Sequence, residues 1–150
     1  MPKNLEAVID IKAAPEKVWN VVSDLKRMPE FSPTTIRMQP IGRTVHTGTW
    51  TVNLNRDGAK VWPTTSRVVR FEPQRALAFR MNESRVIWSF TLEPNEGGTR
   101  LIQRRDIPNG VSAFSRKAIA AGFGPEEGFE AALVDGMNTT LGKIKTLVES

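Results

Sequence analysis

The apolar residues change their spacing once along this 150-residue chain, and this change constrains the fold more than any other feature. Between residues 35 and 107, short segments of alternating apolar and polar residues are separated by Gly, Pro, Asn and Asp, which is typical of an antiparallel meander. Between residues 126 and 148, the apolar residues recur at helical spacing and form one stripe. A helix of that length extends roughly 35 Å, enough to cross a whole sheet. The pattern therefore predicts an α+β fold in which a long C-terminal helix covers a sheet.

The N-terminal segment adds a strand and two short helices. Apolar residues alternate over residues 5–11, which indicates a half-buried strand. Pro15 and Glu16 then suit the first turn of a helix, the proline by its fixed backbone angle and the glutamate by the helix dipole. Residues 28–33 read as a second short helix that a proline turn closes.

The meander is expected to contain six further strands, near residues 36–41, 48–54, 61–71, 76–81, 86–93 and 99–107. Turn residues gather at 55–58, 72–74 and 94–98. Breakers on both sides of residues 112–121 indicate either a short helix or a mobile lid. Because no linker or internal repeat interrupts the chain, residues 1–150 are expected to form a single domain.

The composition removes several kinds of chemistry. The chain has no cysteine, which excludes disulfides, thiolate nucleophiles and metal sites built on sulfur. His46 is the single histidine, so a multi-histidine metal cluster is excluded, and tyrosine is absent. We therefore expect no metal and no cofactor, and few side chains remain for acid–base catalysis.

The charge and the apolar runs limit the partners. Lys and Arg number 21 against 16 Asp and Glu, a net charge of +5, but the basic residues are dispersed and form no tract. No apolar run approaches the roughly 20 residues that cross a bilayer, and the first residues lack the apolar segment of a secretory signal. The chain is thus predicted to be cytoplasmic, a monomer or weak homodimer, without a nucleic-acid partner and without stable membrane insertion.

The order of elements, together with several short motifs, resembles the START and Bet v 1-like superfamily, also called SRPBCC. The motifs are residues 11–19 (IKAAPEKVW), 24–25, 28–31 (MPEF), 88–94 (WSFTLEP) and 97–101 (GGTRL), with Gly136, Met137 and Leu141. The chain looks like the bacterial branch described as polyketide cyclase/dehydrase-like or coenzyme Q-binding-like. This resemblance implies the helix-grip fold, a curved seven-stranded antiparallel sheet wrapped around the C-terminal helix. It implies little about chemistry, because the superfamily holds carriers, cyclases and receptors.

A bent sheet around one helix opens a cavity between them, and alternate strand residues should line it. Alternation predicts that Trp50, Val52 and Leu54 point inward, and so do Leu77, Phe79 and Met81. The same rule places Trp88 and Phe90 inside. The candidate ligand-binding residues are Trp50, Val52, Trp62, Met81, Trp88, Phe90, Gln103, Arg105, Phe129, Leu133 and Met137. Core packing remains the alternative for each apolar member.

Residues 99–107 are the most informative strand. If Leu101 faces inward, Gln103 and Arg105 do so too, and buried polar groups need hydrogen-bond partners. They either pair with an internal group, for which Glu83 is one candidate, or bind the polar group of a ligand. The opposite register would place Arg100, Ile102 and Arg104 inside, which is a less apolar set.

No catalytic residue is assigned. His46 lies in a turn-like stretch and is read as a surface residue, although a general base there is conceivable. Asp24 and Glu30 are either paired acids at the cavity mouth or residues with local roles at helix ends, where Asp24 would be a cap. Ser112 and Ser115 have no evident base beside them.

These observations favour a protein that binds a small hydrophobic molecule such as a lipid, an isoprenoid or a polyketide. Two alternatives stay open. One is an aromatase/cyclase-type enzyme that uses Arg105, Gln103 or His46 to orient a polyketone. The other is a toxin-like or regulatory interaction protein with a vestigial cavity.

Overall fold

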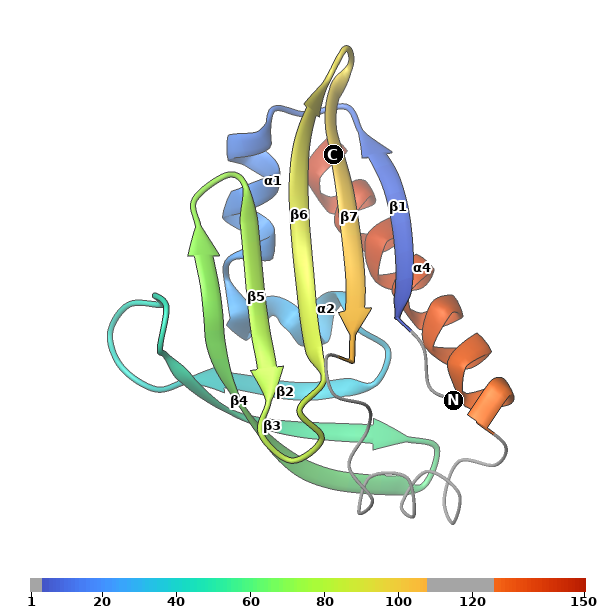
Figure 1. Ribbon diagram of the computed structural model, residues 1–150. Coiled ribbons are helices and arrows are strands. Elements are labelled where there is room, and N and C mark those ends of the chain that lie inside the picture. Colours follow the sequence, from blue (N-terminus) through green and yellow to red (C-terminus); the bar gives the residue numbers. More distant parts are fainter. Residues whose placement is uncertain (1–3, 108–125) are drawn as a thin grey trace.

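The computed structural model describes residues 4–107 and 126–150 (Figure 1). Seven strands form one antiparallel sheet in the order β1-β7-β6-β5-β4-β3-β2. The strands are β1 (Leu5–Ile11), β2 (Thr35–Pro40), β3 (Trp50–Asp57), β4 (Lys60–Glu72), β5 (Ala76–Met81), β6 (Ile87–Asn95) and β7 (Gly98–Asp106). The helices are α1 (Pro15–Val22), the 3-10 turn η1 (Leu25–Arg27), α2 (Met28–Phe31) and α4 (Glu126–Glu149). The predicted helix-grip fold is confirmed.

The N-terminal elements follow from their sequence as predicted. In β1, the side chains of Leu5, Ala7 and Ile11 are buried. Helix α1 starts at Pro15 and buries its apolar face, and it ends where the Ser23 hydroxyl donates a hydrogen bond of 2.7 Å to the carbonyl of Trp19. The backbone N–H of Ser23 bonds to the same carbonyl and closes the last turn.

The turn between β3 and β4 is tighter than expected. Residues 55–58 were predicted as the turn, but Asn55 pairs with Trp62 and Arg56 pairs with Val61 within the ladder. The reversal occurs at Gly58, whose φ of 62° is the left-handed conformation that such a hairpin turn requires. The longer hairpin extends both strands beyond the predicted ends.

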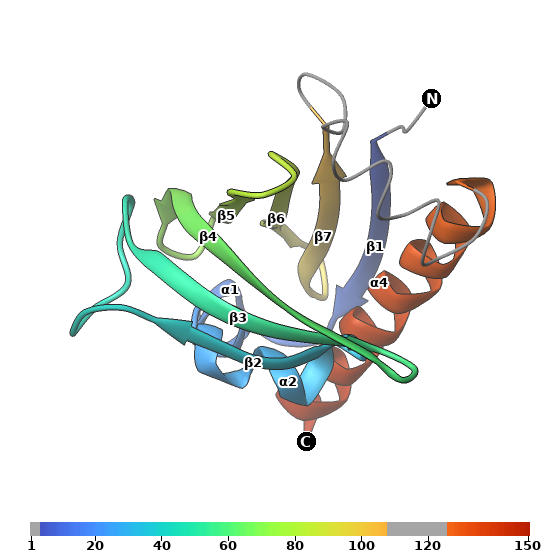
Figure 2. The same cartoon turned by 90° about the horizontal axis from the view of Figure 1, so that it is seen from below.

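Helix α4 lies along β1 at one edge of the sheet and also contacts α1 and α2 (Figure 2). Met137, Leu141, Ile144 and Val148 are buried in one core with residues of β1, β6 and β7. Within residues 4–107 and 126–150, no helix is both long enough and apolar enough to cross a membrane.

The turn between β6 and β7 is fitted closely against the end of β1. Gly98 has a φ of 152°, and a Cβ atom placed there would lie 2.3 Å from the carbonyl oxygen of Ile11. The neighbouring Thr99 hydroxyl donates a hydrogen bond of 2.7 Å to the carbonyl of Ala13. Only glycine allows this approach, which fixes β7 beside β1 and so positions the polar residues of β7 described next.

Candidate ligand-binding site

Two polar side chains of β7 lie on the inner face of the sheet, defined here as the face that carries the buried residues Leu5, Ala7, Phe90 and Leu101. Arg105 pairs across the ladder with Leu5 and Trp88, and Gln103 pairs with Ala7 and Phe90. Cross-strand partners in an antiparallel pair share a face, so both polar side chains point inward.

The burial of these two side chains confirms this orientation. Arg105 is 3% exposed and Gln103 is 8% exposed. The alternative register is wrong, because Arg100 and Arg104 are exposed on the other face, where they form ion pairs with carboxylates. Strand β7 thus brings a planar guanidinium and an amide into a low-dielectric setting, where hydrogen bonds are strong.

Glu83, the internal partner suggested for Gln103 and Arg105, bonds to Thr65 instead. Glu83 accepts hydrogen bonds from the backbone N–H of Thr65, at 2.8 Å, and from its hydroxyl, at 2.5 Å. The carboxylate is exposed there because the turn after β5 carries Glu83 over the neighbouring strand β4. The side-chain oxygen of Gln103, by contrast, is buried and accepts no hydrogen bond from the residues that the structure describes.

Most of the predicted apolar lining lies at this face. Phe90 is buried, while Trp88, Met81 and Leu133 are partly buried and pack against the core. Trp62 shares the inner face through its pairing with Asn55, and Met137 is buried on α4. The backbone of Phe129 belongs to α4, but its side chain lies outside the described residues, as do Ser112, Ser115 and the predicted helix or lid at 112–121.

The inward orientation predicted for Trp50, Val52 and Leu54 is wrong. All three side chains are exposed, whereas Thr51 and Asn53 between them are buried. The alternation of β3 was recognised correctly, but its apolar set lies on the outer face of the sheet. Burial of the polar set is possible because its members bond to one another.

That polar set forms a hydrogen-bonded strip on the inner face of β3 and β4. The Thr51 hydroxyl bonds to the Ser66 hydroxyl and donates to Asn53 Oδ1 at 2.9 Å. The amide of Asn55 donates to the Thr64 hydroxyl at 2.9 Å. Sequence reasoning missed this strip, although matching polar residues at every second position of two paired strands were a signal for it.

The remaining candidates do not join the site. His46 is exposed, with its Nδ1 2.9 Å from the carbonyl oxygen of Thr47. Glu30 accepts a hydrogen bond of 3.0 Å from Arg27 Nε, and this bond lowers the pKa of the Glu30 carboxyl. Asp24 occupies the cap position of η1 without a capping side-chain bond. These groups therefore have local or surface roles in the structure.

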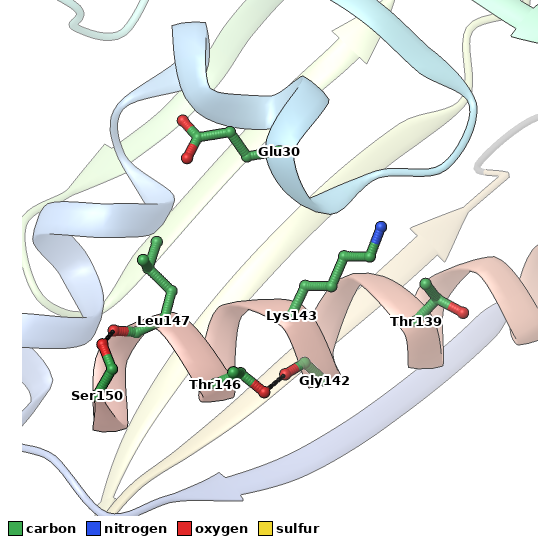
Figure 3. A pocket seen from close by; sticks show the side chains of 7 residues that line it. All are labelled: Glu30, Thr139, Gly142, Lys143, Thr146, Leu147 and Ser150. Atoms are coloured by element: carbon green, nitrogen blue, oxygen red, sulfur yellow. Dashed lines mark hydrogen bonds between the residues drawn. The ribbon is translucent and has the colours of Figure 1, made fainter.

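An open groove between α2 and α4 is a different feature, lined by Glu30, Thr139, Gly142, Lys143, Thr146, Leu147 and Ser150 (Figure 3). The hydroxyl groups of Thr139, Thr146 and Ser150 donate to backbone carbonyls of their own helix, at 2.7 to 3.0 Å. The hydroxyl donors of this groove are thus used within the helix, and its charged groups are those of Glu30 and Lys143.

Comparison with known proteins now assigns a family. The family described as polyketide cyclase/dehydrase and lipid transport matches residues 2–149. The chain belongs to this family. The resemblance noted from the sequence motifs is therefore confirmed. None of the curated proteins matches the chain in sequence.

Solved structures of this fold are also similar. The Zhui aromatase/cyclase from Streptomyces sp. R1128 superposes with a TM-score of 0.78 at 17% identity, over 99% of this chain and 94% of that chain. The Polyketide_cyc-like protein Cgl2372 from Corynebacterium glutamicum has a TM-score of 0.67 at 26% identity, over 99% and 94% of the two chains. The di-domain aromatase/cyclase StfQ of the steffimycin biosynthetic pathway has a TM-score of 0.76 at 14% identity, over 97% of this chain. The 150-residue chain thus corresponds to 50% of the length of the StfQ chain.

Proposed function

We propose that the protein binds a small hydrophobic molecule carrying a hydroxyl and a carbonyl group, held between the inner face of the sheet and α4. The observation that carries the proposal is the buried side-chain oxygen of Gln103, which accepts no hydrogen bond within residues 4–107 and 126–150. An unsatisfied buried acceptor is costly, and a ligand hydroxyl would satisfy it.

The surroundings of Gln103 fit such a ligand. Phe90 lies directly opposite Gln103 on β6, and Trp88 lies opposite Arg105. Flat aromatic side chains suit flat apolar ligands, and a guanidinium donates directionally to a carbonyl oxygen. The two neighbouring positions of β7 thus offer an acceptor for a hydroxyl and a donor for a carbonyl.

Binding is placed before catalysis because of the kind of polar residue that is buried. The buried polar side chains in the described part of the chain belong to Thr, Asn, Ser, Gln and Arg. These groups bind and orient a ligand but do not exchange protons near neutral pH. A cyclase of this family would use the same Arg105 to polarise a ketone, so binding is the step common to both functions.

The test compares a hydroxyanthraquinone with anthraquinone by quenching of tryptophan fluorescence. Gln103→Met keeps the volume and removes the acceptor. We expect its affinity for the hydroxyanthraquinone to fall about tenfold, toward that for anthraquinone, with the melting temperature unchanged or raised. Arg104→Gln, on the outer face of the same strand, is the matched control and should bind as the unmodified chain does.

Arg105→Met extends the test to the carbonyl. It should weaken both anthraquinones by about tenfold or more, because both carry carbonyl oxygens. No saturable binding of either compound, or equal affinities in the Gln103→Met, Arg105→Met and Arg104→Gln variants, would refute the proposal. A lowered melting temperature of Arg105→Met with unchanged affinities would give Arg105 a structural role only.

A further inference from the structure

The outer face of β2, β3 and β4 carries a contiguous apolar patch. It consists of Ile41, Trp50, Val52, Leu54 and Val61, whose exposed fractions range from 36% to 57%. Trp50, Val52 and Leu54 follow one another along the outer face of β3, and Ile41 is bonded beside Trp50 through a backbone hydrogen bond of 2.8 Å. Contiguous exposed patches of large apolar side chains usually mark an interaction surface.

Four arginines surround this outer apolar patch. Arg37 lies opposite Leu54, Arg56 lies opposite Val61, and Arg67 lies opposite both Trp50 and Arg80. All four arginines are exposed. Arg37, Arg56 and Arg67 therefore lie at the rim of the patch, and Arg80 lies beyond Arg67 on the same face of the sheet.

These four arginines carry no compensating carboxylates. Among the residues that the structure describes, none of the four takes part in an ion pair. The Glu83 carboxylate also reaches this face, where its oxygens accept hydrogen bonds from the neutral donors of Thr65, so four arginines still outnumber one carboxylate there.

Arg67 and Arg80 moreover face each other directly across β4 and β5. Like charges at directly opposed positions destabilise a sheet. This side of the sheet therefore concentrates positive charge that an anionic partner would neutralise.

We propose that the outer face of β2–β4 docks reversibly on the surface of an anionic phospholipid bilayer. Trp50 and its apolar neighbours would lie at the level of the lipid headgroups, where tryptophan is favoured. The arginines would bind the phosphates, which a guanidinium recognises through paired hydrogen bonds. The net charge of +5 adds long-range attraction to a negative surface.

The charge pattern argues against a second copy of the chain as the occupant. A two-fold dimer places the same patch of both subunits in contact. Arg67 and Arg80 of one copy would then share an interface with the equivalent arginines of the other, and their charge would exceed that of the Glu83 carboxylates on this face. The docking proposal does not depend on the ligand assigned to the inner face.

Sedimentation of the full chain with vesicles tests the proposal. The vesicles contain phosphatidylcholine either alone or mixed with phosphatidylglycerol. We expect binding to the mixed vesicles only, with an affinity that decreases as salt is added. The double variant Arg67→Gln/Arg80→Gln should bind these vesicles with an affinity lower by about tenfold or more. Trp50→Ser/Val52→Ser should also lose affinity but keep the salt dependence.

Arg100→Gln/Arg104→Gln is the matched control, because it removes the same net charge from arginines that are already paired on β7. Val8→Ser, an exposed apolar residue on β1, is the control for the apolar changes. Equal loss in the control and patch variants, or no binding to the mixed vesicles, would overturn the proposal. Light scattering that shows a dimer, converted to a monomer by Trp50→Ser/Val52→Ser, would assign the patch to a second copy instead and would equally overturn it.

Discussion

The two sides of the sheet have opposite polarity in its two halves. In β1, β6 and β7 the inner face is mostly apolar, and the outer face carries charges that pair with each other, as Arg100 does with Asp10 at 3.2 Å. In β3 and the adjoining part of β4 the inner face carries the Thr, Asn and Ser strip, and Trp50, Val52 and Val61 are exposed outside. The first half follows the usual rule of apolar residues inside, whereas the second reverses it.

The difference shows that alternation identifies a strand but not its buried side. The polar strip can be buried because its hydroxyl and amide groups satisfy one another. The apolar residues can remain outside because single exposed side chains cost little, although a contiguous patch of them indicates an interaction. The first half contributes most of the packed core, and the second half exposes large apolar side chains.

The largest effect is expected where α4 covers the first half. Ile144 is 0% exposed on α4, so Ile144→Asp would bury a carboxylate without a partner, at a cost comparable with the whole stability of a domain of this size. Circular dichroism during heating should show no cooperative transition. Leu147→Asp, three residues later and 36% exposed, is the control and should melt near the unmodified chain. A cooperative transition retained in Ile144→Asp would contradict the packing of α4 on β1.

The next effect concerns the turn that fixes β7 beside β1. In Gly98→Ala the new methyl group would collide with the carbonyl of Ile11 and occupy a strained backbone conformation. We expect a loss of about 3 kcal/mol in the free energy of unfolding, measured by urea titration. Gly97→Ala is the control, because a Cβ there meets no atom within 4 Å. Equal stability of the two variants would show that the turn tolerates a side chain at either position.

The reversed polarity of β3 can be tested with two adjacent residues. Thr51→Val makes the inner face more apolar but removes the hydrogen-bond partner of the Ser66 hydroxyl and of Asn53 Oδ1, so the free energy of unfolding should fall by about 1 to 3 kcal/mol. Val52→Thr makes the outer face more polar and should change the free energy of unfolding by less than about 0.5 kcal/mol. The opposite order of the two effects would restore the usual rule and place Val52 inside.

The smallest effect is a pH dependence at the end of α4. The Glu149 carboxylate accepts a hydrogen bond of 2.9 Å from the backbone N–H of Lys12 and one of 2.5 Å from Lys145, and these bonds lower its pKa below the usual 4.5. A lowered folded-state pKa means that the stabilisation is present above about pH 4.5 and is lost as the pH falls through the lowered value.

Glu149→Gln should therefore melt at a lower temperature than the unmodified chain at pH 7, and the difference should shrink on acidification. Melting curves from pH 7 to pH 3 measure it, and an ordinary exposed position such as Glu93→Gln is the control. A difference that stays constant with pH would show that charge at Glu149 has no part in holding α4 to β1.

The sequence by itself determined the order and type of the elements, because each depends on local spacing. Period-two alternation, glycine and proline punctuation and one helical stripe suffice to place seven strands, the N-terminal helices and α4. The inward orientation of Gln103 and Arg105 also followed, since Leu101 two positions away is apolar and the alternative set contained two arginines. Their ligand-binding role stays a prediction.

Only the tertiary structure decided which side of β3 is buried and which groups satisfy the buried polar residues. Both depend on partners that are distant in the sequence. The Ser66 hydroxyl bonds to the Thr51 hydroxyl. The Glu83 carboxylate, which the sequence suggested as a partner of Arg105, accepts hydrogen bonds from Thr65 instead. Burying a polar group is costly unless the group forms a hydrogen bond, and whether a partner is present depends on the neighbouring strands. The face that a strand buries is therefore set by its neighbours in the sheet, and the alternation within one strand is compatible with either side.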